Sequence, residues 1–327
     1  MLRLTSPFIL SPMAGLTDSA FRRLVKRQGG CGLVVTEMVS SEGLVRGIDR
    51  TLDYAEFTED ERPVAVQIFG GDPEHMARAA QIVEKTGADV VDVNMGCPVP
   101  KVAKSEAGCS LMRDPERAFA IVKAMAGAVS IPVTVKIRAG WNEREVNAPE
   151  LARGLEGAGA AAIAVHGRTA AQSYSGRADW GLIARVARAV SIPVYGNGDC
   201  EEPGDMVRRM KETGVAGVLV GRGALRNPWI FAQAAALAAG HPTPAVALAD
   251  RGRFLLEYID MLLAEGPGDP PSRVAPRRGH QRFVINKLRA LCPWYTRGLE
   301  SGSHLREAVN HSDSIPALRE TIAQFFI

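Results

Sequence analysis

The feature that most constrains this chain is a regular alternation of short apolar runs, rich in valine and isoleucine, with longer stretches of helical pattern. Eight such runs occur, and most are apolar on both faces, as expected of parallel strands covered by helices. Eight β/α units over about 230 residues match the usual size of a (β/α)8 barrel. The predicted strands are Phe8–Met13, Leu33–Met38, Val64–Phe69, Val90–Met95, Val133–Arg138, Ala162–Gly167, Val194–Gly198 and Gly217–Arg222.

An open, doubly wound sheet is the alternative architecture. It predicts a Gly-x-Gly-x-x-Gly turn after an early strand, and the sequence contains neither this turn nor a Gly-x-x-x-x-Gly-Lys-[Ser/Thr] phosphate loop. Helices are expected to begin between the strands. Proline near the beginning of a helical stretch is one sign of such a start, because it is tolerated in the first helical turn. The start signals are Thr17 before Ala20, Asp72-Pro73-Glu74, Asp114-Pro115-Glu116 and Glu202-Pro203. The sequence therefore predicts an α/β protein with a TIM barrel.

The pattern changes after Ala239, where Gly240-His241-Pro242-Thr243-Pro244 indicates a linker. Beyond it we expect only helices, separated in part by breaks at Gly266–Pro271 and Pro276. We therefore expect a barrel domain over residues 1–240 and an all-helical domain over residues 241–327. The predicted helices are Leu248–Leu263, Arg282–Leu291, His304–His311 and Ile315–Phe326.

Composition excludes several classes of protein. With 46% hydrophobic and 23% charged residues, the 327-residue chain is neither disordered, collagenous nor coiled-coil. The apolar run Ile230–Gly240 is too short to span a bilayer, and the N-terminus lacks a signal-peptide pattern, so we expect a cytoplasmic protein without membrane contact. The five cysteines form no Cys-x-x-Cys pair, so neither a disulfide framework nor a metal site is expected. We expect a monomer.

Polar residues lie at the ends of the predicted strands, where barrel enzymes place their active sites. Because unpaired polar groups are costly at such positions, their accumulation at one rim predicts a polar ligand. The glycine-rich turns Gly196–Asp199 and Gly221–Gly223 predict a phosphate site made of backbone N–H groups and the Arg222 guanidinium. A flat heteroaromatic ring, such as that of a reduced flavin, would then lie near three polar side chains, namely Gln67, Lys136 and His166.

At this point the residues resemble the tRNA dihydrouridine synthases, FMN-dependent barrel enzymes, and most closely the bacterial DusB branch. The resemblance runs in order from Ser11 to about Phe231, and its most specific segment is Asn94-Met95-Gly96-Cys97-Pro98. The other matching segments are Ser11–Asp18, Thr36–Ser40, Val66–Gly70, Val135–Arg138, His166–Thr169, Gly196–Asp199 and Val220–Ala224.

The resemblance implies a role for each matched residue. Cys97 would be the general acid. The isoalloxazine and ribityl parts of FMN would be held by Pro12, Met13, Ala14, Gln67, Lys136 and His166, and its phosphate by Asn197, Gly198, Asp199, Gly221 and Arg222. Contacts on the substrate side would come from Asn94, Arg138 and Arg168. NADPH would be the reductant, and the reaction would reduce the C5–C6 bond of a loop uridine in tRNA to 5,6-dihydrouridine.

The net charge of +3, from 39 basic and 36 acidic residues, by itself argues weakly against a nucleic-acid partner. Pro270–Gly298, however, contains seven basic residues and no acidic one. We expect this segment to track tRNA phosphates, with Arg277, Arg278 and Lys287 as contacts and with His280, Trp294 and Tyr295 as stacking partners. The alternative is a solvated helix face with Trp294 in the core.

Three other functions remain open at this point. A flavin barrel acting on a free pyrimidine, in the manner of dihydroorotate dehydrogenase, would not need the basic helical tail. A Schiff-base aldolase would use Lys136 as its nucleophile. A tRNA-binding chaperone without catalysis would not need Cys97 and Lys136, both of which are intact.

Overall fold

The computed structural model describes residues 4–103, 106–265 and 279–327. The centre of the fold is one sheet of parallel strands in the order β2-β1-β9-β8-β7-β6-β5-β4-β3. A further pairing of β2 with β4 closes the sheet into a barrel. The strands are β1 (Phe8–Leu10), β2 (Leu33–Val35), β3 (Val39–Ser40), β4 (Val64–Phe69), β5 (Val90–Met95), β6 (Val133–Arg138), β7 (Ala162–His166), β8 (Val194–Asn197) and β9 (Gly217–Val220).

The second predicted strand, Leu33–Met38, ends early at Val35, and the short β3 follows it at Val39–Ser40. Both β2 and β3 pair with β4, with Val34 opposite Val64 and Val39 opposite Ile68. Between them, the hydroxyl oxygen of Thr36 accepts a hydrogen bond from the backbone N–H of Gln67 at 3.1 Å. Since β2 and β3 share one position in the barrel, the predicted (β/α)8 architecture is confirmed.

Strand alternation decides which side chains face the inside of the barrel. In β4, Val64, Val66 and Ile68 pack outward into the main core, so Ala65 and Gln67 face inward. The inward side chains nearest the N-terminal ends form a separate apolar cluster of Ile9, Leu33, Val35, Ala65, Val90 and Leu219. This cluster closes the bottom of the barrel and leaves the polar inward positions at the opposite, C-terminal end.

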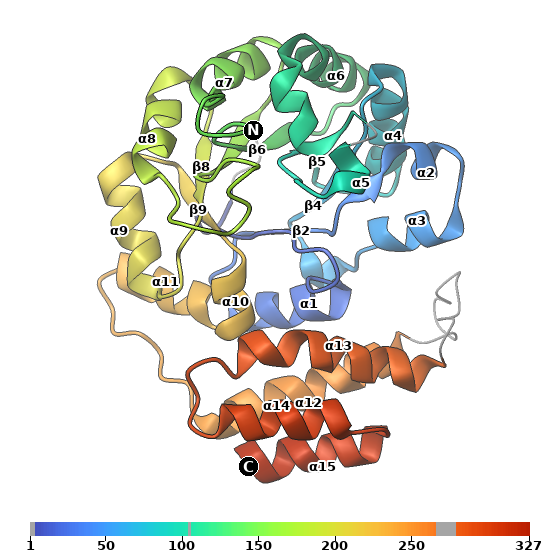
Figure 1. The fold of residues 1–327 in the computed structure, drawn as a ribbon, viewed down its shortest axis with the longest axis vertical. Helices are drawn as coiled ribbons and strands as arrows, with labels where there is room; N and C mark the ends of the chain where they lie inside the picture. Colours follow the sequence, from blue (N-terminus) through green and yellow to red (C-terminus); the bar gives the residue numbers. More distant parts are fainter. Residues whose placement is uncertain (1–3, 104–105, 266–278) are drawn as a thin grey trace.

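Helices surround the barrel, and a second group of helices lies beneath it (Figure 1). The elements up to residue 240 are α1 (Ser19–Gln28), α2 (Ser41–Val45), α3 (Asp49–Ala55), η1 (Glu59–Glu61), α4 (Pro73–Lys85), α5 (Pro100–Ala103), η2 (Gly108–Arg113), α6 (Pro115–Ala128), α7 (Ala148–Gly157), α8 (Trp180–Ala189), α9 (Pro203–Thr213), α10 (Arg222–Arg226) and α11 (Ile230–Ala238). The second group consists of α12 (Leu248–Ala264), α13 (His280–Tyr295), α14 (Gly302–His311) and α15 (Ile315–Phe326).

The predicted helix starts are confirmed with one exception. Asp72 and Asp114 cap α4 and α6 through their carboxylates. The first helix is capped not by Thr17 but by Asp18, whose carboxylate accepts a hydrogen bond from the N–H of Phe21 at 3.0 Å. Thr17 lies one residue too early for this role. Its buried hydroxyl instead accepts the N–H of Met13 at 2.9 Å and closes the turn after β1.

The C-terminal helices match the predicted four, although α13 is longer at both ends than the predicted Arg282–Leu291. It continues through Pro293 and ends at Tyr295. The breaks expected at Gly266–Pro271 and Pro276 lie outside the described residues. No helix within residues 4–103, 106–265 and 279–327 is both long and apolar enough to cross a membrane.

Candidate active site at the mouth of the barrel

A chain of hydrogen bonds crosses three strands inside the barrel. The Asp92 carboxylate accepts from the Thr134 hydroxyl at 2.5 Å and from the Gln67 amide nitrogen at 2.7 Å. The Gln67 amide oxygen then accepts from the Asn94 amide nitrogen at 2.7 Å. Since a carboxylate only accepts, Asp92 fixes the orientation of the Gln67 amide, and this amide fixes that of Asn94. Burial raises the pKa of Asp92, while its hydrogen bonds and Lys136 act in the opposite direction.

This chain of hydrogen bonds ends at Cys97. The Asn94 side-chain oxygen accepts from the backbone N–H of Gly96 at 3.1 Å and of Cys97 at 2.9 Å. On the other side, the Cys97 carbonyl accepts from the N–H of Cys109 at 3.1 Å. A Cβ on Gly108 would lie 2.8 Å from that carbonyl oxygen, so this close approach requires glycine. Cys97 is half-buried, whereas the other four cysteines are buried.

Lys136 and His166 face the same opening from β6 and β7. The Lys136 ammonium lies 3.3 Å from the side-chain oxygen of Asn197. Burial, assisted by the charge of Arg138, lowers the pKa of Lys136 to about 8. Burial also lowers the pKa of His166, and the charges of Lys136 and of nearby arginines lower it further. His166 is therefore a neutral imidazole, able to donate one hydrogen bond and accept another.

The predicted phosphate turn lies beside two guanidinium groups. Asp199 accepts from Arg168 at 2.8 and 2.9 Å and from Arg222 at 3.3 Å. Its positive φ of 49° follows Gly198, where an added Cβ would lie 2.5 Å from that of Ala178. Arg168 is only 2% exposed, and its Nη1 has no hydrogen-bond partner in the described part of the chain.

Arg138 is committed to the protein backbone. Its guanidinium donates to the carbonyl of Gly96 at 2.7 Å, of Thr169 at 3.0 Å and of Ser173 at 2.9 Å. It therefore ties the Cys97 loop to the loop after β7. Tyr174 in that second loop was not predicted from the sequence. It is 60% exposed and lies against both Arg138 and Arg222.

The loop after β1 brings Pro12, Met13 and Ala14 to the rim, with Ala14 exposed and the other two half-buried. The sulfur of Met13 lies 3.1 Å from the position that a Cβ on Gly221 would take. This contact places the loop next to the turn after β9. The predicted cofactor residues therefore converge from both sides on one opening.

The basic residues of the helical region have several different environments. Arg277 and Arg278 lie outside the described residues. The Lys287 ammonium is 2.8 Å from the carboxylate of Asp18 on the barrel. Arg289 donates to the carbonyl of Ser312 at 2.8 Å and so ties α13 to the end of α14.

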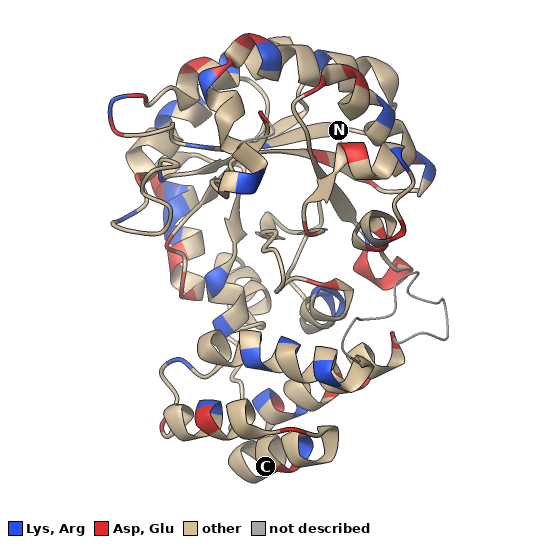
Figure 2. Cartoon of the chain, turned by 45° about the vertical axis from the view of Figure 1, so that its right-hand side comes forward, with Lys and Arg blue, Asp and Glu red and all other residues tan. Residues whose placement is uncertain are grey.

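The prediction that Tyr295 stacks on RNA is wrong. It is fully buried, its ring stacks on Phe254, and its hydroxyl donates to the carbonyl of Arg251 at 2.9 Å. Trp294 is half-buried and packs against the core. Arg282 and Arg297 are exposed, and Figure 2 shows the basic segments along α13.

The family model described as "Dihydrouridine synthase (Dus)" matches residues 9–314. The chain belongs to the dihydrouridine synthase family. The sequence resemblance is thereby confirmed, and so is the predicted kind of enzyme, an oxidoreductase.

Two curated relatives show how far the similarity extends. A "Probable tRNA-dihydrouridine synthase" of Rhodobacter capsulatus is 43% identical over 84% of this chain and 85% of its own. A "tRNA-dihydrouridine synthase B" of Pseudomonas aeruginosa is 38% identical over 99% of this chain and 93% of its own. The second relative agrees with the predicted likeness to the DusB branch.

Solved structures share the fold at low sequence identity. Histamine dehydrogenase from Rhizobium sp. 4-9 has a TM-score of 0.55 and 13% identity over 79% of this chain. A 2-naphthoyl-CoA reductase has a TM-score of 0.54 and 12% identity over 73% of this chain. The chain spans about half of each of these structures, 49% and 51% respectively.

The barrel mouth of this dihydrouridine synthase fits a flavin nucleotide. The Arg222 guanidinium suits its phosphate, while Lys136 and the neutral His166 suit a polar ring. Asp199, itself an anion, would orient Arg168 and Arg222 rather than touch the phosphate. In the described residues, no group of three or more His, Cys, Asp or Glu side chains could hold a metal ion.

Proposed function

We propose that this protein is an FMN- and NADPH-dependent tRNA-dihydrouridine synthase that reduces a loop uridine of tRNA. The observation that carries the proposal is the placement of the half-buried Cys97 thiol. Asn94 holds the Cys97 backbone at the same rim as Lys136 and His166. The family match favours this function over a free-pyrimidine reductase, a Schiff-base aldolase and a non-catalytic chaperone.

The cofactor contacts follow from the geometry of the rim. Gln67, Lys136 and His166, with the loop of Pro12, Met13 and Ala14, would hold the isoalloxazine and ribityl parts. Asn197, Gly198, Gly221 and Arg222 would hold the phosphate, and Asp199 would fix the direction of Arg222. When bound, FMN reduced by NADPH supplies the hydride for C6 of uracil.

Cys97 would hold the proton that C5 of uracil receives. A thiol carries a proton that it is able to donate, as a general acid requires. Asn94 would position Cys97 through the backbone and face the uracil. Arg138 and Arg168 would act on the substrate side by holding the loops around it.

The helical region is proposed as a tRNA-binding domain. Residues 1–240 would form the catalytic domain and residues 241–327 the RNA-binding domain, in a cytoplasmic monomer. A uridine has to leave its stack to reach the barrel mouth, and unpaired loop bases cost least to extract. Arg277 and Arg278 would contact phosphates, whereas Lys287 would support tRNA binding by holding the helical region on the barrel.

The central test is Cys97→Ala in FMN-loaded protein with unmodified tRNA. We expect NADPH to reduce the flavin at the wild-type rate, because Cys97 is not needed for that step. Dihydrouridine formation should fall by about 10²–10⁴-fold, the usual contribution of a general acid. Cys31→Ala, which removes a buried thiol elsewhere, is the control and should not change either rate. Normal uridine reduction by Cys97→Ala would refute the assignment.

The RNA-binding role has its own test. Replacing Arg277 and Arg278 by alanine should weaken tRNA binding and lower the slope of log K against log salt by about 1.5, since each lost phosphate contact removes about 0.7–0.9. NADPH oxidation should persist. Arg208→Ala, on the exposed side of α9, removes one positive charge away from the helical region and is the control. An unchanged salt slope would contradict the proposed RNA contact.

A further inference from the structure

The loop that carries Pro12, Met13 and Ala14 is held by charged side chains at Gly15. The Gly15 N–H donates to the Glu37 carboxylate at 2.8 Å, and its carbonyl accepts from the Lys287 ammonium at 3.1 Å. Gly15 has a φ of +82°, a conformation that suits glycine. Both backbone groups of one residue in the loop after β1 are therefore bound by side chains from distant parts of the chain.

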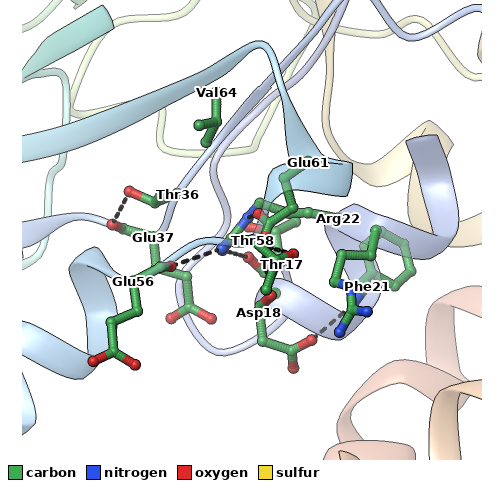
Figure 3. A network of polar contacts seen from close by, with 12 residues as sticks. Thr17, Asp18, Phe21, Arg22, Thr36, Glu37, Glu56, Thr58, Glu61 and Val64 are labelled. Carbon is green, nitrogen blue, oxygen red and sulfur yellow. Dashed lines mark hydrogen bonds and ion pairs between the residues drawn. The ribbon is translucent and has the colours of Figure 1, made fainter. Parts of the chain in front are cut away.

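These side chains form a cluster that we name the loop clasp: Lys287, Asp18 and Glu37. The Lys287 ammonium lies 2.8 Å from Asp18 and 4.0 Å from Glu37. The three side chains are only 13%, 17% and 7% exposed. Asp18 also accepts from the hydroxyl of Tyr258 on α12 at 2.7 Å. Figure 3 shows Asp18 at the start of α1, with Glu37 near the buried network of Arg22 and Glu61.

The clasp joins the C-terminal helices to the rim of the barrel. Lys287 comes from α13 and Tyr258 from α12, whereas Asp18 and Glu37 follow β1 and β2. Burial acts to lower the pKa of Lys287, but the two carboxylates raise it overall, so the ammonium stays charged. Burial raises the pKa of Glu37, and the charge of Lys287 opposes this effect.

We infer that Lys287 is a positioning residue that sets the Pro12–Gly15 loop for flavin binding from the C-terminal helical region. This role deepens the proposed function and rests on it. Without the ammonium, the two shielded carboxylates repel each other and the Gly15 carbonyl loses its donor. The loop then loses its fixed distance from the turn at Gly221, which Met13 contacts.

The packing of α13 does not depend on Lys287. Val284, Leu288 and Leu291 are at most 1% exposed and hold the helix against its neighbours. Lys287→Met keeps the apolar stem and removes only the charge. This substitution is therefore expected to loosen the loop while leaving the helical region folded.

The test measures FMN binding to apo-protein through quenching of free FMN fluorescence. Lys287→Met should weaken FMN binding at least about tenfold, which corresponds to about 1.4 kcal/mol. Arg253→Met is the matched control, because Arg253 is exposed on α12 and pairs with Asp250 of its own helix. Its FMN affinity should equal that of the wild type.

Two further variants separate positioning from general damage. Adding Glu37→Gln to Lys287→Met should recover part of the FMN affinity, because glutamine still accepts the Gly15 N–H without leaving a second unpaired charge. Asp18→Asn alone should weaken FMN binding several-fold, since it removes the nearest partner of Lys287 but keeps an oxygen to cap α1. Asp18→Asn decides the question if Lys287→Met does not fold.

The outcomes are distinguishable. Wild-type FMN affinity in folded Lys287→Met, or in Asp18→Asn, overturns the inference and leaves the proposed function standing. Equal losses in Lys287→Met and Arg253→Met, without recovery by Glu37→Gln, also overturn it, because they indicate a general loss of stability. A wild-type protein that does not bind FMN refutes the proposed function and the inference with it.

Discussion

The hydrogen-bond chain below Cys97 can be tested by one isosteric substitution, Gln67→Glu. The Gln67 amide nitrogen now donates to the Asp92 carboxylate at 2.7 Å. In the variant, a second carboxyl oxygen takes the place of that nitrogen. The oxygen that accepts from Asn94 is retained, so the connection toward Cys97 is kept while the connection to Asp92 becomes a contact between two acids.

The variant either keeps both carboxylates charged or protonates one of them, and the free-energy costs of the two states decide between them. Two carboxylates 2.7 Å apart repel by about 6 kcal/mol at an effective dielectric constant of about 20. Keeping one of them protonated at pH 7 costs about 4 kcal/mol, given reference pKa values of about 3.9 and 4.3 and 1.36 kcal/mol per pH unit. Protonation is the cheaper solution, so the folded variant should bind one more proton than its unfolded chain.

The pH dependence follows from this extra proton. Because the folded pKa of the pair is raised above its unfolded value, the stability of the variant is greatest at low pH and is lost as pH rises. Relative to wild type, its free energy of unfolding should be nearly unchanged near pH 4. The deficit should grow by about 1.4 kcal/mol per pH unit and reach about 4 kcal/mol at pH 7.

Urea denaturation of the apo-proteins between pH 5 and pH 8 measures this difference. Gln81→Glu, on the outer face of α4, adds the same carboxylate at an exposed position and should show no such trend. A deficit for Gln67→Glu that is the same at pH 5 and pH 7 would refute the reasoning. It would mean that Gln67 does not face an ionised Asp92.

Two further predictions concern buried charges. In the wild type, the Arg22 guanidinium lies 2.5 Å from the fully buried Glu61 carboxylate. Arg22→Met leaves that carboxylate without its cation and should lower the free energy of unfolding in urea by about 3–5 kcal/mol. A loss under about 1 kcal/mol would contradict this. Lys136, with its pKa lowered to about 8 from 10.5, binds fewer protons when folded, so stability of the apo-protein should rise between these pH values by up to about 3 kcal/mol. Lys136→Met should abolish that rise, and an unchanged pH profile would show that another group causes it.

Much of the site could be predicted because successive side chains of a barrel strand alternate between the inside and the outside. Once Val64, Val66 and Ile68 are assigned outward, Gln67 has to face the mouth of the barrel, and the same reasoning applies to Lys136 and His166. Asp92 and Thr134 lie on the same inward faces, two residues before Asn94 and Lys136. An acidic residue inside an apolar strand was a readable signal for Asp92.

Some features of the structure were not predicted, because they depend on tertiary contacts. One was readable from the helical spacing of apolar residues. The early end of the second strand at Val35 accompanies a tertiary contact, the hydrogen bond between the Thr36 hydroxyl and β4. Tyr174 lies in a loop without any periodic pattern. Tyr295, by contrast, follows Leu288 and Leu291 at helical spacing, which indicates burial.

The charges at the barrel mouth explain why a net charge of only +3 says little about the ligand. Burial keeps His166 neutral, and the charges of four cations add to this effect, namely Lys136, Arg138, Arg168 and Arg222. The two carboxylates near these four cations are Asp92 and Asp199. Asp92 receives its hydrogen bonds from an amide and a hydroxyl rather than from a cation. A shielded opening with excess positive charge is stabilised by an anion, because the anion offsets the repulsion among the cations. The mouth of the barrel therefore favours a phosphate-bearing ligand, whatever the balance of charges over the rest of the chain.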